Sequence, residues 1–584
     1  MSSLNEPQSN GKMWWRSLDE VVKRDAIQAK LNDEFPEGAQ DLLATGKDRR
    51  HFLKIMGASM ALAGLGLSGC RRWPKEHIVP YAHRPEGTMP GIPEHFASCF
   101  DFGGVSQGVL VTSNDGRPTK IEGNPEHPDS LGATDGFTQA SILDLYDPDR
   151  SRGVKYKGEA SSIHAFAEWA DVYLPEKGKG LAVLVEPSSS PTVQRMKRAL
   201  KKKYTELLWV EYAPLDPANE RAALAHAFGG NWRAIPDFGH AEVIVSLDSD
   251  FLGVSPTQVP DTRGWAKGRK PHSHSMNRLL VAEPSLTVTG SKADERVAVK
   301  PTRVEVLAQA IAAKYAGFSH DAVLSADEQA WLDLVFESLD HAHQGHGLIV
   351  AGASQPPIVH YLAARINEAI GAAGHTVSYR MIDNASDATL EELAGAMDAG
   401  SIQGIIIVGG NPAFSAPSAL NFAERIQSLP MSAHLSYYEN ETSTKCKWHV
   451  NQAHWLETWN DGQSVDGTLC IGQPLIEPLF GGVSDAEFLA IIAGETATDS
   501  QTLVRATFNP RADQRTPAWR KMVHDGVVPG TGHLETPPVN RNPLAHTATT
   551  TSTTEVCFVP SGSVWDGRYA NNGWMQELPD TITK

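Results

Sequence analysis

The amino-acid sequence predicts an α/β protein whose strands form mostly parallel sheets. From about residue 180 onward, short runs of Val, Ile and Leu alternate with longer stretches of helical periodicity. These runs are almost continuously apolar, as expected for strands that are covered on both faces. The chain has 584 residues, of which 41% are hydrophobic and 21% are charged. It therefore has ordinary globular composition and room for roughly two to four domains.

The alternation gives a set of strands and the helices that connect them. The predicted strands are Leu181–Val185, Leu207–Tyr212, Val243–Leu247, Leu279–Ala282, Leu348–Ala351 and Ile405–Val408. The predicted helices cover residues 192–203, 217–228, 303–316, 357–371 and 389–399. Strands that alternate with helices in this way are typical of Rossmann-like units, and we expect two of them in one body.

A β-hairpin is predicted ahead of the α/β part, at residues 105–121. Val109–Val111 leads into Asn114-Asp115-Gly116, and Thr119–Ile121 leads the chain back. Asp-Gly between two such runs is a strong turn signal. Residues 71–104 are rich in proline and are predicted to form an irregular strap over a surface. The Thr/Ser run Thr547–Thr554 is predicted to be a linker.

These features divide the chain into five predicted regions. They are an extended N-terminal export region (1–47), an export signal (48–75), a hairpin and strap region (76–155), the α/β domains (156–545), and a linker with the start of a truncated C-terminal segment (546–584).

Charge and cysteine content exclude two classes of protein. There are 52 Lys and Arg against 69 Asp and Glu, which gives a net charge of −17 and argues against a nucleic-acid partner. The five cysteines are Cys70, Cys99, Cys446, Cys470 and Cys557, and no two form a C-x-x-C motif. An iron–sulfur cluster bound by four cysteines in this chain is therefore not expected.

The N-terminal region resembles a twin-arginine export signal. Arg49 and Arg50 precede Phe52-Leu53-Lys54, and an uncharged run follows from Ile55 to Gly69. That run is too short to span a bilayer comfortably but has the length of a signal core. It ends at Leu67-Ser68-Gly69-Cys70, which resembles a lipobox, so Cys70 is the predicted site of lipidation. The alternative is a plain cleavage site with an incidental cysteine.

The loops that follow the predicted strands are the candidate binding residues of the α/β part. Ligands bind at the carboxyl ends of parallel strands, and these loops are rich in Gly and Ser. They contain Ser188, Ser189, Asp248, Glu283, Gly409 and Asn411. A nucleotide-like ligand would contact their backbone N–H groups and hydroxyls. The alternative is that they are ordinary tight turns.

Two groups of histidines are candidate metal sites. His341, His343 and His346 lie close together in a polar stretch, and His449 and His454 precede Glu457. Neither spacing is H-E-x-x-H. We expect the first group to be a solvated loop and the second to be structural.

Several segments together resemble the molybdopterin oxidoreductase superfamily. They are Gly116–Pro128 with the hairpin turn, Leu145–Arg150, Gly409–Pro412, and His454–Glu457 followed by Asp466-Gly467. The resemblance implies Rossmann-like parallel sheets of the molybdopterin oxidoreductase type. It also implies that the Gly/Ser-rich loops are the pterin-side loops if the protein is active.

A narrower resemblance covers essentially the whole chain. HPDSLGATDGFTQASILDLYDPDRS, SAHLSYYENETSTKCKWHV and WDGRYANNGWMQELPDTITK resemble the molybdopterin-like part of the large iron–sulfur subunit of alternative complex III. MWWRSLDEVV and LNDEFPEGA resemble the extended twin-arginine domain of such subunits. The family is a membrane-bound quinol:electron-acceptor oxidoreductase. Its molybdopterin-like domain resembles the enzymes in fold without the cofactor.

This sequence departs from the catalytic members of the superfamily. Those members commonly carry three cysteines around the first hairpin and a fourth before the L-Y-x-P-D-R segment. Here that region holds Cys99 alone, and the fourth position falls near Asp135. No molybdenum-ligating Ser or Cys is identifiable either, since Ser188–Ser190 suit a tight turn better.

The resemblance therefore implies a scaffold subunit without a redox centre of its own. Iron–sulfur clusters are expected on a partner chain or on a missing domain, because the large subunit of the family continues beyond ELPDTITK. The implied partners are iron–sulfur, haem c and quinol-binding membrane subunits, and the implied location is the periplasm or the outer face of the cytoplasmic membrane. The alternative is an active molybdopterin-dependent oxidoreductase of unknown substrate.

Overall fold

The computed structural model describes residues 89, 91–270, 276–382, 386–508, 516–545 and 554–582. The chain divides into two compact units, residues 1–86 and 87–584, and the described residues all belong to the second unit. The predicted export region, the predicted signal with Cys70, and residues 547–553 of the predicted linker lie outside the described residues.

The described chain begins with an antiparallel sheet of three strands. Its strands are β1 (Glu94–Phe102), β2 (Val105–Asn114) and β3 (Arg117–Gly123), in that order. The predicted hairpin is confirmed as β2 and β3. The predicted strap is wrong at residues 94–102, where β1 pairs with β2 along its whole length. The last proline before β1 is Pro93, and β1 itself contains none. Its backbone N–H groups can therefore all take part in the hydrogen bonds of the sheet. Helix α5 (Gly136–Leu145) follows.

The first parallel sheet is built from both ends of the α/β region. Its order is β5-β4-β16-β15-β14-β6-β7, and the strands from β16 to β7 are parallel. The bounds are β4 (Lys155–Tyr156), β5 (Glu159–Ala160), β6 (Leu181–Val185), β7 (Leu208–Glu211), β14 (Gly404–Val408), β15 (Met431–Ser436) and β16 (Trp448–Asn451). Because β6 and β14 are neighbours, the strands of the second parallel sheet are inserted in the sequence between β7 and β14.

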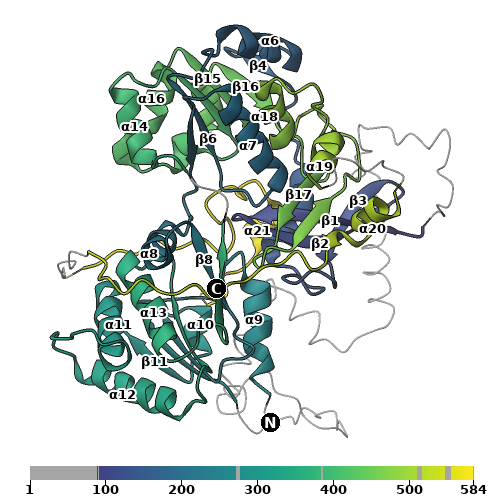
Figure 1. Cartoon of the computed structure of the whole chain (residues 1–584). Helices are drawn as coiled ribbons and strands as arrows, with labels where there is room; N and C mark the ends of the chain where they lie inside the picture. Colours follow the sequence, from purple (N-terminus) through teal and green to yellow (C-terminus); the bar gives the residue numbers. More distant parts are fainter. Residues whose placement is uncertain are drawn as a thin grey trace, which may run out of the picture. The chain divides into compact units, whose positions relative to one another are not determined.

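Helices cover both faces of this first sheet (Figure 1). One face packs on α6 (Ile163–Tyr173), α7 (Pro191–Lys203), α18 (Asp485–Ala493) and α19 (Ser500–Phe508). The other face packs on α14 (Leu390–Asp398) and α16 (Phe422–Ser428). Burial on both faces explains why β6 reads as a continuous apolar run, with every one of its residues buried.

The second parallel sheet has the order β11-β10-β9-β12. Its strands are β9 (Val243–Leu247), β10 (Arg278–Glu283), β11 (Glu295–Ala298) and β12 (Gly347–Ala351). Helices α11 (Pro301–Tyr315), α12 (Ala326–His341) and α13 (Pro357–Ala369) cover one face. The antiparallel ribbon of β8 (Trp232–Pro236) and β13 (Val377–Met381) packs on the other face.

The remaining elements are shorter or lie at the margins of the sheets. They are α8 (Ala218–Phe228), α9 (Gln258–Lys267), α10 (Val288–Ser291), α15 (Pro412–Ser415), η1 (Ser418–Leu420), α17 (Glu441–Lys445), β17 (Asn460–Gln463), β18 (Leu469–Gly472), α20 (Pro517–Asp525), β19 (Val527–Val528) and α21 (Gly573–Glu577). Strands β17, β18 and β19 form a third, antiparallel sheet, and β1 contacts both β17 and β18. The predicted α/β class with parallel sheets is confirmed, and so are the six predicted strands and five predicted helices, within a few residues at their ends.

Candidate functional site

The strand orders place a topological switch point in each parallel sheet. In the first sheet the chain order reverses between β6 and β14, and in the second it reverses between β9 and β12. Ligands of open α/β sheets bind in the crevice at such points, outside the carboxyl ends of the strands. The predicted residues Ser188, Ser189, Gly409 and Asn411 follow β6 and β14, whereas Asp248 and Glu283 follow β9 and β10.

The switch point of the first sheet is bridged by an ion pair from the C-terminal segment. Arg568 Nη2 donates to Glu186 Oε1 at 2.5 Å and to Asp566 Oδ2 at 2.6 Å. Glu186 lies directly after β6 and reaches the turn after β14. A Cβ atom at Gly409, whose φ is +69°, would lie 3.1 Å from Glu186 Oε2. The glycine therefore permits this close approach, and the Glu186 side chain lies against the turn after β14.

The predicted serines after β6 are held by Asp101 of β1. Asp101 Oδ2 accepts hydrogen bonds from Ser189 N and Ser189 Oγ, both at 2.8 Å, and from Ser188 Oγ at 3.4 Å. Burial raises the pKa of Asp101, and the Ser189 hydrogen bonds oppose that rise. The serine hydroxyls thus hold the turn against the antiparallel sheet.

The N-terminus of α7, the helix that follows this turn, is also occupied. Asp461 Oδ2 of β17 accepts from Thr192 N at 3.1 Å and from Thr192 Oγ1 at 2.6 Å, and Asp461 Oδ1 accepts from Ser190 Oγ. In dinucleotide-binding folds a phosphate takes this place at a helix N-terminus. Here a carboxylate of the chain takes it, and burial raises the pKa of Asp461 to about 6.

Asn411 bonds to neighbouring side chains of α17. Its Oδ1 accepts from Thr442 N at 3.2 Å and from Thr442 Oγ1 at 2.8 Å, and its Nδ2 donates to Glu441 Oε2 at 2.7 Å. Both ends of the amide therefore have partners within the loop cluster.

The switch point of the second sheet is bridged by local hydrogen bonds. Asp248 Oδ2 accepts from Ser354 Oγ at 3.0 Å and from Gln355 Nε2 at 2.8 Å. A Cβ atom at Gly352 would lie 1.8 Å from the Asp248 carbonyl oxygen, so the two loops touch through their backbones. Glu283 accepts from Arg296 Nε at 2.5 Å and from Thr287 Oγ1 at 2.6 Å.

Two of the motifs that carry the superfamily resemblance meet in a buried ion pair. Arg150 Nη2 donates to Glu457 Oε2 at 2.7 Å, and Nη1 donates to Oε1 at 3.1 Å. Their side chains are 2% and 0% exposed. The Leu145–Arg150 and His454–Glu457 segments are thus structural partners. The sequence marks both segments through the superfamily resemblance, but it contains no sign that they pair.

A buried chain of hydrogen bonds leads from the Gly409-Gly410 turn to Ser151. His434 Nε2 donates to both glycine carbonyls, and Ser443 Oγ joins His434 Nδ1 (2.8 Å) to His449 Nδ1 (2.9 Å). His449 Nε2 bonds to Ser151 Oγ at 2.5 Å. Burial lowers the pKa of His434 to about 3 and that of His449 to about 4, so both rings are neutral. These histidines are bonded core residues.

The region that holds the fourth cysteine of catalytic members forms a polar network in this chain. Asp135 caps α5 by accepting from Thr138 N at 2.7 Å, and it accepts from Gln107 Nε2 at 2.6 Å. Thr138 Oγ1 donates to Gln107 Oε1 at 2.9 Å. Asp135, Thr138 and Gln107 are all buried, so the side chains around Asp135 satisfy one another.

The histidine groups do not form metal sites among the described residues. His343 Nδ1 bonds to Glu242 Oε1 at 2.7 Å, and His341 Nδ1 bonds to the Glu337 carbonyl at 2.6 Å. Within the described part of the chain, no group of three or more His, Cys, Asp or Glu side chains is arranged to hold a metal ion. Across the same residues, no helix has the length and apolar character needed to cross a membrane.

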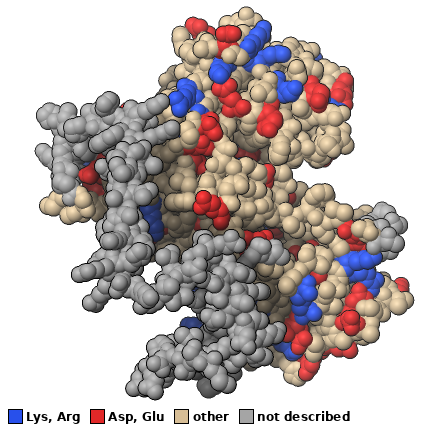
Figure 2. Space-filling model, turned by 180° about the vertical axis from the view of Figure 1, so that it is seen from behind, with Lys and Arg blue, Asp and Glu red and all other residues tan. Residues whose placement is uncertain are grey.

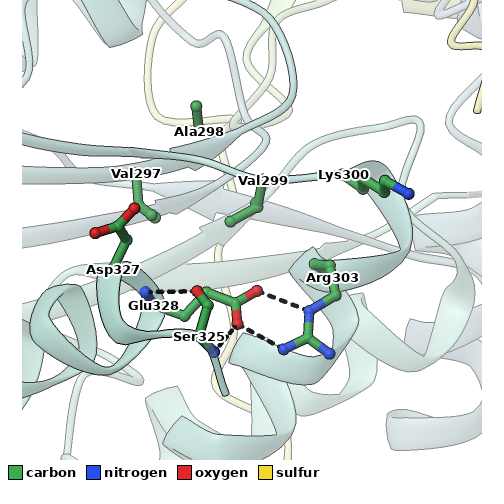
Figure 3. A pocket seen from close by; sticks show the side chains of 8 residues that line it. All are labelled: Val297, Ala298, Val299, Lys300, Arg303, Ser325, Asp327 and Glu328. Atoms are coloured by element: carbon green, nitrogen blue, oxygen red, sulfur yellow. Dashed lines mark hydrogen bonds and ion pairs between the residues drawn. The ribbon is translucent and has the colours of Figure 1, made fainter. Parts of the chain in front are cut away.

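A surface groove of about 410 Å³ lies between β11 and the start of α12 (Figure 3). Arg303 and Glu328 form a bidentate ion pair in this groove. Arg303 Nε donates to Glu328 Oε1 at 2.7 Å, and Arg303 Nη2 donates to Glu328 Oε2 at 2.6 Å. Ser325 caps α12 and exchanges hydrogen bonds with Glu328. The polar groups of this groove therefore stabilise the helix start. Elsewhere on the surface, acidic and basic side chains are interspersed over the described part of the face in Figure 2.

The predicted export and lipidation residues, Arg49, Arg50 and Cys70, lie outside the described residues. Their roles stay predictions.

A curated protein and a solved structure illustrate what the chain is similar to. No family model matches the chain. The chain is 20% identical over 512 residues to the menaquinone reductase, molybdopterin-binding-like subunit, of Nitratidesulfovibrio vulgaris, an alignment that covers 77% of this chain and 72% of that protein. Acetylene hydratase from Pelobacter acetylenicus matches with a TM-score of 0.48 and 12% identity, over 68% of this chain and 69% of that one. The similarity to the first protein supports the resemblance to the molybdopterin oxidoreductase superfamily that the sequence motifs carry.

Proposed function

We propose that the chain is a non-catalytic scaffold subunit of a membrane-bound quinol:electron-acceptor oxidoreductase complex of the alternative complex III type. The observation that carries this proposal is that side chains of the chain itself bridge both switch points. Arg568 joins Glu186 and Asp566 at the first, and Asp248 joins Ser354 and Gln355 at the second. A cofactor that lay across these edges would have to displace both sets of contacts.

The residues at these edges do not fit a pterin nucleotide. Asp461 occupies the N-terminus of α7, where a phosphate would otherwise bind, and Asp101 holds the serines that follow β6. The Asp461 carboxylate would repel a cofactor phosphate at that helix end. We therefore assign no cofactor-dependent step to this chain and expect the iron–sulfur clusters on a partner chain.

The similar protein supports a role in quinone-linked electron transfer. It is named as a subunit of a menaquinone reductase and as molybdopterin-binding-like. We propose that this chain likewise assembles with partner subunits, and that these are iron–sulfur, haem c and quinol-binding membrane subunits.

Metal and pterin analysis of the purified full chain tests the scaffold role. We expect neither molybdenum nor tungsten in stoichiometric amount, and no bound pterin. A stoichiometric metal with a pterin would favour the alternative, an active molybdopterin-dependent oxidoreductase.

A second measurement uses the assembled complex. The double variant Ser188→Ala with Ser189→Ala should leave quinol oxidation within about twofold of the wild type, because these hydroxyls bond to Asp101 and each contributes about 1 kcal/mol to the turn. A hundredfold loss, with the complex intact on a native gel, would contradict the scaffold role, since each 1.4 kcal/mol of barrier is a factor of about ten.

We also propose export by the twin-arginine route and a lipid anchor at Cys70, which place the protein at the outer face of the cytoplasmic membrane or in the periplasm. The double variant Arg49→Lys with Arg50→Lys should remain in the cytoplasm on fractionation, and Cys70→Ala should abolish incorporation of labelled palmitate. Normal export of the first variant, or labelling of the second, would contradict the respective proposal.

A further inference from the structure

A pocket of about 120 Å³ lies beside the first switch point and is lined by three arginines. Arg198 comes from α7, Arg233 from β8 and Arg380 from β13. Among the residues that the structure describes, the rest of the lining is neutral and consists of Gly104, Ser188, Ser189, Pro191, Gln194, Ile382 and Gln463. We propose that this pocket binds a small inorganic oxyanion of the size of phosphate or sulfate. The proposal does not depend on the proposed scaffold role.

Two of the arginines are placed against each other by the strand register. Arg233 of β8 lies directly opposite Arg380 of β13 in the antiparallel ribbon. Like charges in directly opposite positions destabilise a sheet. Burial, followed by the charge of Arg233, lowers the pKa of Arg380 to about 10. An anion between the two guanidinium groups would remove this repulsion.

Arg380 is fixed by its own hydrogen bonds, whereas Arg233 is not. Arg380 Nη1 donates to the carbonyls of Ser464 at 2.8 Å and Val465 at 3.3 Å, and Nη2 donates to Gln463 Oε1. Among the residues that the structure describes, Arg233 makes no side-chain hydrogen bond or ion pair, and the acids near it act through their charge alone. Its guanidinium therefore keeps its donors for a ligand in the pocket.

The acids near Arg233 already have other partners. Glu220 accepts from Ala234 N at 2.9 Å, Asp216 pairs with Arg221, and Asp101 accepts from Ser188 and Ser189. No acid of the described part of the chain lines the pocket itself. The described lining of the pocket therefore offers guanidinium groups and no carboxylate to an entering anion.

The size of the pocket sets the class of ligand. Pockets for drug-sized ligands have volumes of about 300–1,000 Å³. At about 120 Å³ this pocket is too small for a nucleotide or a pterin, but it can hold a tetrahedral oxyanion. Guanidinium groups bind the oxygens of such ions through pairs of parallel hydrogen bonds.

Isothermal titration of the purified full chain with inorganic phosphate, at constant ionic strength set with chloride, tests the proposal. We expect saturable binding of one phosphate and competition by sulfate. Arg233→Gln should weaken phosphate binding at least tenfold. Arg198→Gln, whose side chain is exposed at the rim, should weaken it about threefold. The matched control is Arg520→Gln on α20, an exposed arginine outside the pocket, which should bind as the wild type does.

Circular dichroism checks that each variant is folded. If Arg233→Gln does not fold, Arg198→Gln decides the question, because this side chain is exposed. Heat of phosphate addition no greater than that of chloride, or equal phosphate affinity in the wild type and the folded variants, would overturn the proposal. A nucleoside monophosphate or a phosphate monoester that binds more than tenfold more tightly than phosphate would overturn the assignment to a free ion.

Discussion

The two parallel sheets close their switch points with different kinds of contact. In the first sheet the bridge is an ion pair between Glu186 and Arg568, which are 382 positions apart in the sequence. In the second sheet the bridge joins Asp248 to Ser354 and Gln355, which lie in the loops after the neighbouring strands β9 and β12. The contact at the first switch point depends on a distant segment. The contacts at the second form between two loops of the same sheet.

This difference indicates which switch point depends on packing elsewhere in the chain. The C-terminal segment reaches Glu186 because Trp565, Tyr569 and Met575 pack against Phe102 and Phe137. A change in that packing would release the first switch point and leave the second intact. The following variants test this distinction, from the largest expected effect to the smallest.

Trp565→Ala should have the largest effect. Trp565 is 8% exposed, and its ring centroid lies 4.8 Å from that of Phe102. Its truncation should lower the free energy of unfolding by about 3 kcal/mol, as is usual for a buried large aromatic residue. Hydrogen exchange should become faster in residues 186–190 and stay unchanged in residues 352–355. Denaturant unfolding and exchange mass spectrometry measure the two effects.

The matched control for Trp565→Ala is Trp519→Ala. Trp519 is 3% exposed and packs with Ile471 and Val504 in a separate cluster. Trp519→Ala should lower the free energy of unfolding by a similar amount. It should not make hydrogen exchange selectively faster in residues 186–190. Equal acceleration of both loops in Trp565→Ala would contradict the distinction between the two closures.

Arg568→Met should have an intermediate effect that depends on pH. Because Arg568 is partly exposed, its loss should cost about 1 kcal/mol at pH 7. Burial alone would raise the pKa of Asp566, but the hydrogen bond and charge of Arg568 lower it below its usual value. A carboxyl with a lowered pKa stabilises the fold above its unfolded pKa of about 4, and that stability is lost as the pH falls through the folded pKa.

The measurement is the free energy of unfolding of the wild type and Arg568→Met at pH 7 and at pH 3. The difference between the two proteins should shrink at pH 3. A difference that stays constant over this range would show that Arg568 does not lower the pKa of Asp566.

Asp248→Asn should have the smallest effect, and with the opposite sign. Burial raises the pKa of Asp248, so ionisation of this carboxyl costs stability as the pH rises from about 4 through the folded pKa. The amide keeps one acceptor and tolerates the φ of +61° at this position. We expect a gain of about 0.5 kcal/mol or less at pH 7 and no difference at pH 3.

Asp248→Ala is the control for this variant. It removes both hydrogen bonds to the carboxylate and should cost about 1 kcal/mol at pH 7. Thermal or denaturant unfolding of the three proteins at both pH values decides the sign, and destabilisation by Asp248→Asn at pH 7 would refute it.

Three of the strands that the sequence predicts, β6, β9 and β14, are buried at every position. Val243–Leu247 is apolar except at Ser246, because helices cover one of its faces and the β8–β13 ribbon covers the other. Strands such as β17, with the sequence NDGQ, have no such pattern, because pairing with β18 and the antiparallel sheet determines their conformation. Strand β1 was missed for the same reason, since its alternation is weak and the preceding prolines suggested an irregular path.

The sequence predicts where the candidate site lies, but not which side chains contact one another there. Loops that follow apolar strands can be found in the sequence, and Ser188, Ser189, Gly409 and Asn411 do lie at one sheet edge. Asp101, Asp461 and Arg568, which hold or fill that edge, come from other parts of the chain. Single charged residues far apart in the sequence leave no local pattern that would pair them.

The insertion of one sheet within the other has a consequence for the order of folding. Val183 of β6 must pair with Ile406 of β14, so the first sheet has to wait until the whole second sheet has been synthesised. The strands of the second sheet follow one another more closely, and its formation shortens the loop that the β6–β14 pairing must close. During synthesis the second sheet can therefore form early, while the apolar edge of β6 remains unpaired and open to misassociation.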